Sequence, residues 1–136
     1  DAFRINEIYL CGITATPDNS LTEIHKTALG AEDSVKWEYY SNTIDVVEKL
    51  KMDGYTIVSV EQVEQSIKLD EFKADSSKHY ALILGNEVKG VQQEVVDISD
   101  ISLEIPQYGT KHSLNVSVSA GIVLWEFAKQ LKNMLD

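Results

Sequence analysis

The sequence predicts an α/β protein, built on a parallel β-sheet with helices on both of its faces. Short apolar runs alternate with segments of helical periodicity along the chain, a pattern typical of βαβ units. The run YALIL, residues 80–84, is almost uniformly apolar, as expected of a central parallel strand. With 136 residues and no visible linker or internal repeat, the chain is expected to form one domain.

Four further segments have the composition of strands. EIYLCGI is a short apolar run that ends at the turn-prone TATPDNS, and VKWEYY is rich in aromatic and β-branched residues. YTIVSVE follows a glycine, and ISLEI alternates apolar with more polar positions. These patterns predict strands over residues 7–13, 35–40, 55–61 and 101–105.

Helical signals separate the strands. Ser20 and Glu23 form a capping box at the start of a predicted helix over 21–29, and apolar spacing predicts a second helix over 43–52. Further along we expect a short helix over 62–68, a polar surface loop over 70–79, a loop turning into a helix over 87–96, and a long helix over 113–134. The apolar positions expected for the long helix are Leu114, Val118, Ile122, Trp125, Phe127, Leu131 and Leu135.

Composition limits the location and the partners of the protein. The net charge is −10 with only 12 Lys and Arg residues, which by itself argues against tight, non-specific binding of nucleic acid. No apolar run approaches the roughly 20 residues that span a bilayer, and Cys11 is the single cysteine, which fits a reducing compartment. A soluble, cytoplasmic protein is therefore expected. The three histidines lack the spacing of metal ligands, so no metal is expected.

Two predicted strands end in unusual loops, LGNEVKGV after residue 83 and PQYGTKHSLN after Ile105. Ligands of parallel α/β sheets bind outside the carboxyl ends of the strands, so a site is expected between these loops. GNEVKG is not a Walker A loop, because Val91 and Gln92 follow its second glycine where Lys and Ser or Thr are required. Taken alone, GNEVKG is most simply a tight turn before a helix.

Taken together, the two loops carry a family resemblance. LILGNEVKGV followed by IPQYGTKHSLNVSVSAGIVLWE resembles the second and third motifs of the SpoU/TrmH family, the RNA ribose 2′-O-methyltransferases of the SPOUT class. The resemblance extends to DAF, YLCGITATPDN and HKTALGAEDSV, so it covers essentially the whole chain. It implies a parallel sheet with a C-terminal trefoil knot, and S-adenosyl-L-methionine as the cofactor, held in the knot largely by backbone groups of these loops.

The resemblance also implies roles for individual residues. Cofactor contacts are expected from Leu84, Gly85, Asn86, Ile105, Gln107, Ser113 and Leu114. Asn115, Ser113 and Glu87 match polar motif positions and are the candidate catalytic residues. For Asn115 a second interpretation stays open, in which it is a residue at the start of a helix that satisfies local backbone donors. Methyl transfer from a sulfonium requires positioning and proton removal, and no metal.

One family element has no counterpart in the sequence. The family handles the ribose hydroxyl with an arginine of its first motif, which would stand a few residues before Asp1, whereas Arg4 occupies the place of a family glycine. We therefore expect residues 1–136 to be an N-terminally truncated SPOUT methyltransferase domain that is inactive alone. The other interpretation is a natural remnant that lacks catalytic power.

The predicted function is S-adenosylmethionine-dependent 2′-O-methylation of a ribose in tRNA or rRNA. The alternatives are a non-catalytic cofactor-binding or dimerisation module and a generic flavodoxin-like nucleotide-binding domain. The family implies a homodimer formed through the knot region and the last helix, which fits Trp125, Phe127 and Leu131, although these residues could simply cover the sheet. Lys89 and Lys111 are the residues expected to contact RNA phosphates.

Overall fold

The structure, a computed structural model, describes residues 2–12, 34–86, 89–110 and 114–134. The chain forms two compact units, Asp1–Val46 and Val47–Asp136. The predicted helix over 21–29 lies outside the described residues. Within the described ranges, no helix combines the length and the apolar character that a membrane span requires.

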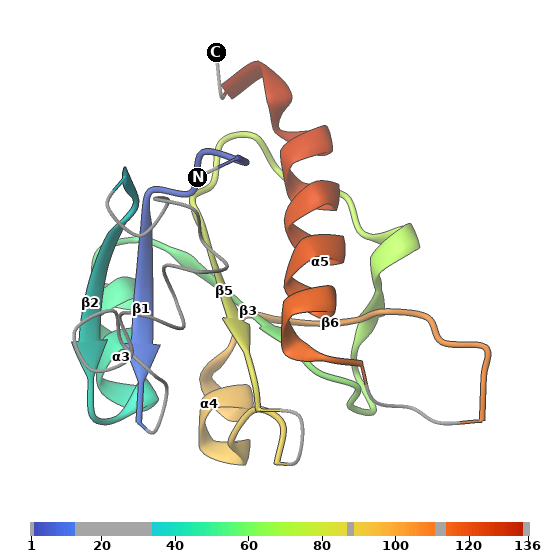
Figure 1. The fold of residues 1–136 in the computed structure, drawn as a ribbon, viewed down its shortest axis with the longest axis horizontal. Coiled ribbons are helices and arrows are strands. Elements are labelled where there is room, and N and C mark those ends of the chain that lie inside the picture. The colour runs from blue at the N-terminus through green and yellow to red at the C-terminus, as the bar shows by residue number, and fades with distance from the viewer. Residues whose placement is uncertain (1, 13–33, 87–88, 111–113, 135–136) are drawn as a thin grey trace. The chain divides into compact units, whose positions relative to one another are not determined.

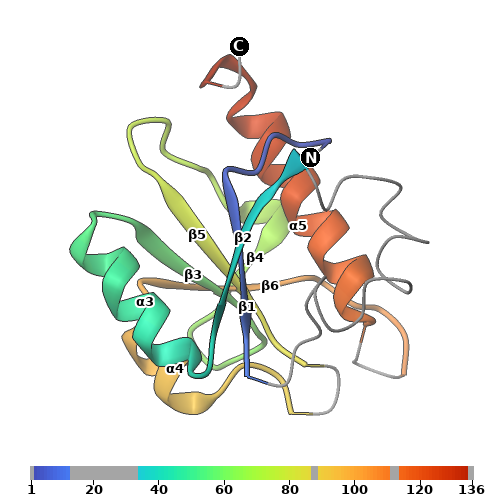
Figure 2. The same ribbon diagram turned by 60° about the vertical axis from the view of Figure 1, so that its left-hand side comes forward.

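The first unit contains a pair of parallel strands, β1 (Glu7–Cys11) and β2 (Lys36–Tyr40), which run side by side in Figure 2. The predicted strands over 7–13 and 35–40 are therefore confirmed, although Ile13 is outside the described residues. Aromatic side chains strengthen the pair, because the rings of Tyr9 and Tyr40 meet edge to face with centroids 5.8 Å apart.

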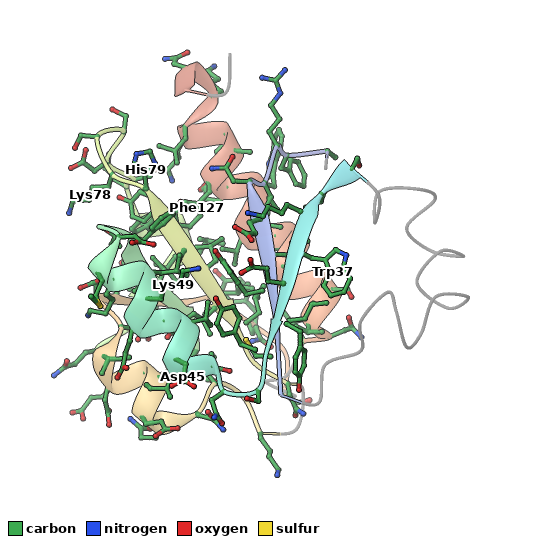
Figure 3. All side chains as sticks on the ribbon, turned by 90° about the vertical axis from the view of Figure 1, so that its left-hand side faces the viewer. Trp37, Asp45, Lys49, Lys78, His79 and Phe127 are labelled. Atoms are coloured by element: carbon green, nitrogen blue, oxygen red, sulfur yellow. The ribbon has the colours of Figure 1, made fainter. Side chains whose placement is uncertain are left out.

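Helix α3 (Thr43–Met52) begins in the first unit and ends in the second, with the bounds that the sequence predicted. Asp45 lies in its first turn and Lys49 in its last turn, and both charges complement the helix dipole (Figure 3). Gly54 follows the last turn of the helix and stops it, because its φ of 89° is in the left-handed region and its N–H donates to the Lys51 carbonyl at 3.0 Å.

The second unit is built on four parallel strands in the order β4-β6-β3-β5, and Figure 1 labels β3, β5 and β6 of this sheet. Their bounds are Thr56–Val60 for β3, Ile67–Lys68 for β4, Tyr80–Leu84 for β5 and Ile101–Glu104 for β6. The strands predicted over 55–61, 80–84 and 101–105 are confirmed. The expected central position of β5 is not found, because β5 pairs only with β3 and forms an edge of the described sheet. Its five residues are accordingly half-buried.

Helices cover both faces of this sheet, as predicted. Val58 packs in a core cluster with Val123 and Phe127 of α5 (Val116–Gln130). The next residue of β3, Ser59, points to the opposite face, where its hydroxyl contacts the hydroxyl of Ser99 at the end of α4 (Gln93–Ile98). Figure 2 shows α4 and α5 on opposite sides of β3.

The prediction of a short helix over 62–68 is wrong. Ile67 and Lys68 instead form β4 beside β6, and a 3₁₀ helix, η1 (Leu69–Glu71), follows. Pairing with β6 supplies backbone hydrogen bonds and outweighs the weak helical propensity of so short a segment.

The prediction of a surface loop over 70–79 is wrong at Phe72, which is only 7% exposed. Its ring lies 5.2 Å from that of Phe127, and the ring of Phe127 also lies 5.2 Å from that of Tyr80. The side chain of Gln130, at the end of the long C-terminal helix, binds the backbone of this segment. It accepts from the Ala74 N–H at 2.6 Å and donates to the Phe72 carbonyl at 2.9 Å.

Helix α5 is shorter than predicted and carries two apolar faces. Residues Val116–Gln130 are helical, and a 3₁₀ turn, η2 (Lys132–Met134), follows. Val123 and Phe127 are buried in the core, whereas three of the predicted apolar positions are exposed. These three residues, here called the α5 stripe, are Val118, Ile122 and Trp125.

Candidate functional site

The carboxyl ends of β3, β5 and β6 surround one pocket within the second unit. This position agrees with the rule that parallel sheets bind ligands at the carboxyl ends of their strands. The described residues that line it are Val60, Glu61, Gln62, Leu84, Gly85, Asn86, Gly90, Leu103, Glu104, Ile105, Gln107, Leu114, Val116 and Ser119.

One wall of the pocket is formed by Gly85, Asn86 and Gly90, which belong to the Gly85–Val91 loop; residues 87–88 of this loop lie outside the described residues. Asn86 closes it, because its carbonyl accepts from the Gly90 N–H at 2.8 Å and its side chain accepts from the Lys89 N–H at 2.9 Å. A Cβ on Gly85 would stand only 2.2 Å from the carbonyl carbon of Gly90. Gly90 has a φ of +68°. Gly85 is thus required by backbone packing and Gly90 by its backbone conformation. The tight turn inferred from GNEVKG is confirmed.

The opposite wall is formed by the segment after β6 and the start of α5. Ile105 and Gln107 follow the strand, and Leu114 precedes the helix. Val116 and Ser119, on the first turn of α5, complete this wall. The pocket therefore has apolar surface from Leu84, Ile105 and Leu114, which could pack against the face of a flat aromatic ring such as a purine.

The structure brings together six of the predicted cofactor-binding residues. All six line the single pocket described above, and they are Leu84, Gly85, Asn86, Ile105, Gln107 and Leu114. Glu87, Ser113 and Lys111 lie outside the described residues.

Asn115 is exposed and is not among the residues that line the pocket. Its side-chain oxygen accepts from the Ser117 N–H at 2.8 Å, so Asn115 is the N-cap of α5. The interpretation of Asn115 as a helix-start residue therefore describes its observed contact. Lys89 is exposed and does not line the pocket either.

Two acidic residues of the pocket were not predicted, Glu61 and Glu104. Glu61 follows β3 directly and Glu104 is the last residue of β6, so each lies at a carboxyl strand end. The Glu104 carboxylate accepts from the Ser66 hydroxyl at 3.0 Å, and the Glu61 carboxylate accepts from the Val91 N–H at 2.9 Å. The sequence signal for both was their position at the carboxyl end of an apolar strand, because ligands of parallel sheets bind at these ends.

The charge of the pocket limits the ligand that it can take. Glu61 and Glu104 are acidic, and no basic residue is found among the described lining residues. Two carboxylates disfavour an anionic ligand such as a phosphate and favour one with positive charge. A sulfonium cofactor with an adenine ring fits both the charge and the apolar walls. Across the described residues, no group of three His, Cys, Asp or Glu side chains is arranged to hold a metal ion.

The parallel sheet and the pocket between its two loops indicate an α/β ligand-binding protein. Comparison with known sequences identifies its family. Residues 1–125 match the SpoU rRNA Methylase family, and the chain belongs to this family. A tRNA (guanosine(18)-2′-O)-methyltransferase from Aquifex aeolicus is 38% identical over 102 residues, which are 73% of this chain and 47% of that protein. The chain spans about half the length of most of the curated relatives it matches.

Solved structures agree with this assignment. The A. aeolicus TrmH/SpoU tRNA modifying enzyme superposes with a TM-score of 0.82 at 30% identity, over 98% of this chain and 65% of that chain. An AdoMet-bound rRNA methyltransferase from Sinorhizobium meliloti superposes with a TM-score of 0.83 at 28% identity, over 96% of this chain and 48% of that chain.

Proposed function

We propose that this chain forms the cofactor-binding part of an S-adenosylmethionine-dependent RNA 2′-O-ribose methyltransferase that acts on tRNA or rRNA. The observation that carries the proposal is the pocket, in which six residues of the two motif loops meet. Membership of the SpoU rRNA Methylase family supports the reaction, and the S. meliloti relative, whose structure is described as AdoMet bound, supports the cofactor. A cytoplasmic location is part of the proposal, since tRNA and rRNA are its substrates.

S-adenosylmethionine would be held by Leu84, Gly85, Asn86, Ile105, Gln107 and Leu114, and when bound it would supply an activated methyl group for transfer to the ribose 2′-oxygen. The task of the protein is then mainly to position donor and acceptor. Gly85 and Gly90 bring backbone close to the ligand, and Leu84, Ile105 and Leu114 would enclose the adenine.

Glu87, Ser113 and Asn115 remain the proposed catalytic residues on the acceptor side. The contact of Asn115 adds a specific role for it within this proposal. By capping α5, Asn115 fixes the first turn of the helix, which contributes Val116 and Ser119 to the pocket.

A trefoil knot is also part of the proposal. The segment after β6 and the Gly85–Val91 loop line the same pocket, as they must if the C-terminal part of the chain passes through that loop. The SpoU/TrmH likeness supports the same topology.

The proposed assembly is a homodimer in which the α5 stripe is covered by a second copy. Val118, Ile122 and Trp125 are 50%, 39% and 58% exposed, and their spacing places them along one side of the helix. Phe127 instead lies in the core, and Leu131 packs against it. Of the three residues that were expected at the interface, only Trp125 therefore belongs to the exposed stripe. Within this proposal, Lys89 and Lys111 contact RNA phosphates despite the net charge of −10.

The test is to map 2′-O-methyl groups on tRNA and rRNA from cells with and without the gene, and to measure S-adenosylmethionine binding to the intact protein by calorimetry. We expect one or more marks to disappear and the cofactor to bind. Binding without any lost mark would instead support the non-catalytic module. Absence of binding would contradict the proposal and favour a generic nucleotide-binding domain.

A further inference from the structure

Glu61 connects the three strand ends that form the pocket. Its backbone N–H donates to the Leu103 carbonyl of β6 at 2.9 Å. Its side chain reaches in the other direction, where Oε2 accepts from the Val91 N–H at 2.9 Å, at the end of the loop that follows β5. Glu61 itself extends β3, is half-buried and lines the pocket.

The loop lies so close to this carboxylate that their positions depend on each other. A Cβ on Gly90 would stand 2.3 Å from Oε2 of Glu61, so only a glycine leaves room for the contact. The other end of the loop is closed by Asn86 and by the packing of Gly85 on the Gly90 backbone. In the described structure, the Glu61 carboxylate is the side chain that ties this closed loop to the end of β3.

The hydrogen bond from the Val91 N–H to the Glu61 carboxylate is charge-assisted, which suits it to hold the loop in one position. A hydrogen bond from a backbone N–H to a carboxylate is shorter and stronger than one between neutral groups. Removal of the acceptor would leave the half-buried Val91 N–H without this partner, which costs more than the net value of an average hydrogen bond.

We propose that Glu61 is a positioning residue for the methyl-donor site, and that its carboxylate holds the Gly85–Val91 loop in the conformation that binds S-adenosylmethionine. The inference rests on the proposed function, because the ligand is the methyl donor of that function. A role of the Glu61 charge in attracting the sulfonium is the competing explanation, and substitutions separate the two. Glu61→Gln keeps an acceptor oxygen at the same reach without the charge, whereas Glu61→Asp keeps the charge but is one methylene shorter.

The experiment measures S-adenosylmethionine affinity of the intact protein by calorimetry, and amide hydrogen exchange at Val91 without ligand. We expect Glu61→Ala and Glu61→Asp to weaken binding about 10- to 100-fold and to accelerate Val91 exchange. Glu61→Gln is expected to weaken binding only about threefold, because it keeps the acceptor oxygen and loses only the contribution of the charge. The matched control is Glu64→Ala, an exposed acidic residue of the same segment outside the pocket lining, which should change neither measurement.

Activity separates positioning from a general loss of stability. With Glu61→Ala, KM for the methyl donor should rise about as much as the dissociation constant, while kcat at saturating donor changes less. Glu61→Gln binding as weakly as Glu61→Ala, or unchanged affinity and exchange in Glu61→Ala, would overturn the inference and leave the proposed function standing. Failure of the unsubstituted protein to bind the donor would overturn the proposed function and the inference with it.

Discussion

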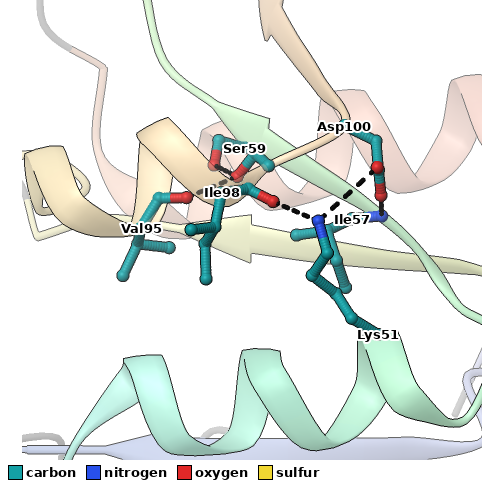
Figure 4. Close-up of polar contacts among 7 residues, drawn as sticks. Lys51, Ile57, Ser59, Val95, Ile98 and Asp100 are labelled. Atoms are coloured by element: carbon teal, nitrogen blue, oxygen red, sulfur yellow. Dashed lines mark hydrogen bonds and ion pairs between the residues drawn. The ribbon is translucent and has the colours of Figure 1, made fainter.

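Asp100 and Ile57 join the starts of β6 and β3 by two hydrogen bonds. The Ile57 N–H donates to the Asp100 carboxylate at 2.8 Å (Figure 4), and the Asp100 N–H donates to the Ile57 carbonyl at 2.9 Å. Lys51 adds an ion pair to the same carboxylate at 3.6 Å and donates to the Ile98 carbonyl at 2.6 Å. These contacts lie at the amino ends of the strands, whereas the pocket lies at the carboxyl ends. We therefore expect them to affect stability rather than ligand binding.

Asp100→Ala should lower the free energy of unfolding by about 1–2 kcal/mol, because a backbone donor loses a charged acceptor that is only partly screened by solvent. Asp100→Asn keeps an acceptor and should cost less. Lys51→Met tests the partly exposed ion pair and should cost about 1 kcal/mol or less. Urea unfolding gives all three values. If Lys51→Met were as costly as Asp100→Ala, the ion pair rather than the Ile57 bond would be the main stabilising contact.

Gly85→Ala should disrupt the pocket, because the new Cβ would stand 2.2 Å from the carbonyl carbon of Gly90, a backbone atom that cannot easily move. Overpacking of this kind typically costs about 1–3 kcal/mol. We expect a lower urea midpoint and a large loss of S-adenosylmethionine affinity. Gly109→Ala is the control, since a Cβ there meets nothing within 4 Å. Unchanged affinity in Gly85→Ala would show that the loop adapts and does not shape the site.

Sequence patterns predicted most of the strands and α3, because strand and helix periodicities report which face of an element is buried. They failed between Val60 and Phe72, where pairing of β4 with β6 and burial of a single aromatic ring depend on distant residues. The pocket loops were found from their motifs. Glu61 was missed although it directly follows a predicted strand. Its contact with Val91 left no pattern in the sequence, because Val91 is thirty residues away and contributes a backbone group.

Phe127→Ala should destabilise the fold by about 3–5 kcal/mol, since it removes a ring that is 6% exposed and contacts both Phe72 and Tyr80. Phe127→Leu should cost roughly half of that, because it keeps much of the apolar volume. Denaturant unfolding of the intact protein measures both. Equal stability of Phe127→Ala and the unsubstituted protein would mean that α5 does not pack on the sheet as described.

Trp125→Glu should weaken self-association at least tenfold and change the stability of the monomer little, because Trp125 is 58% exposed on the α5 stripe. Sedimentation velocity over a range of micromolar concentrations measures the dimer. Met52→Glu is the matched control, an exposed apolar residue on α3 that is 89% exposed and lies outside the stripe. Equal weakening by both substitutions would argue against the stripe as the interface, and an unsubstituted protein that stays monomeric would contradict the dimer itself.

Cys11 should make stability depend on pH in the alkaline range. Burial raises the pKa of its thiol above the ordinary value of 9.0, and a hydrogen bond with Thr43 opposes the shift in part. Well below pH 9.0 the thiol is almost entirely protonated in the folded and the unfolded chain, so it adds almost no pH dependence there. Above that value the unfolded chain releases the proton first, and stability is lost as pH rises toward the folded pKa. Urea unfolding at several pH values should show this loss in the unsubstituted protein and a smaller one in Cys11→Ala. Equal pH profiles for the two proteins would show that burial of the thiol does not shift its ionisation.

The same burial should slow the reaction of the thiol with an alkylating reagent. Iodoacetamide should alkylate Cys11 more slowly in the folded protein than in urea at pH about 8, because the thiolate is the reactive form.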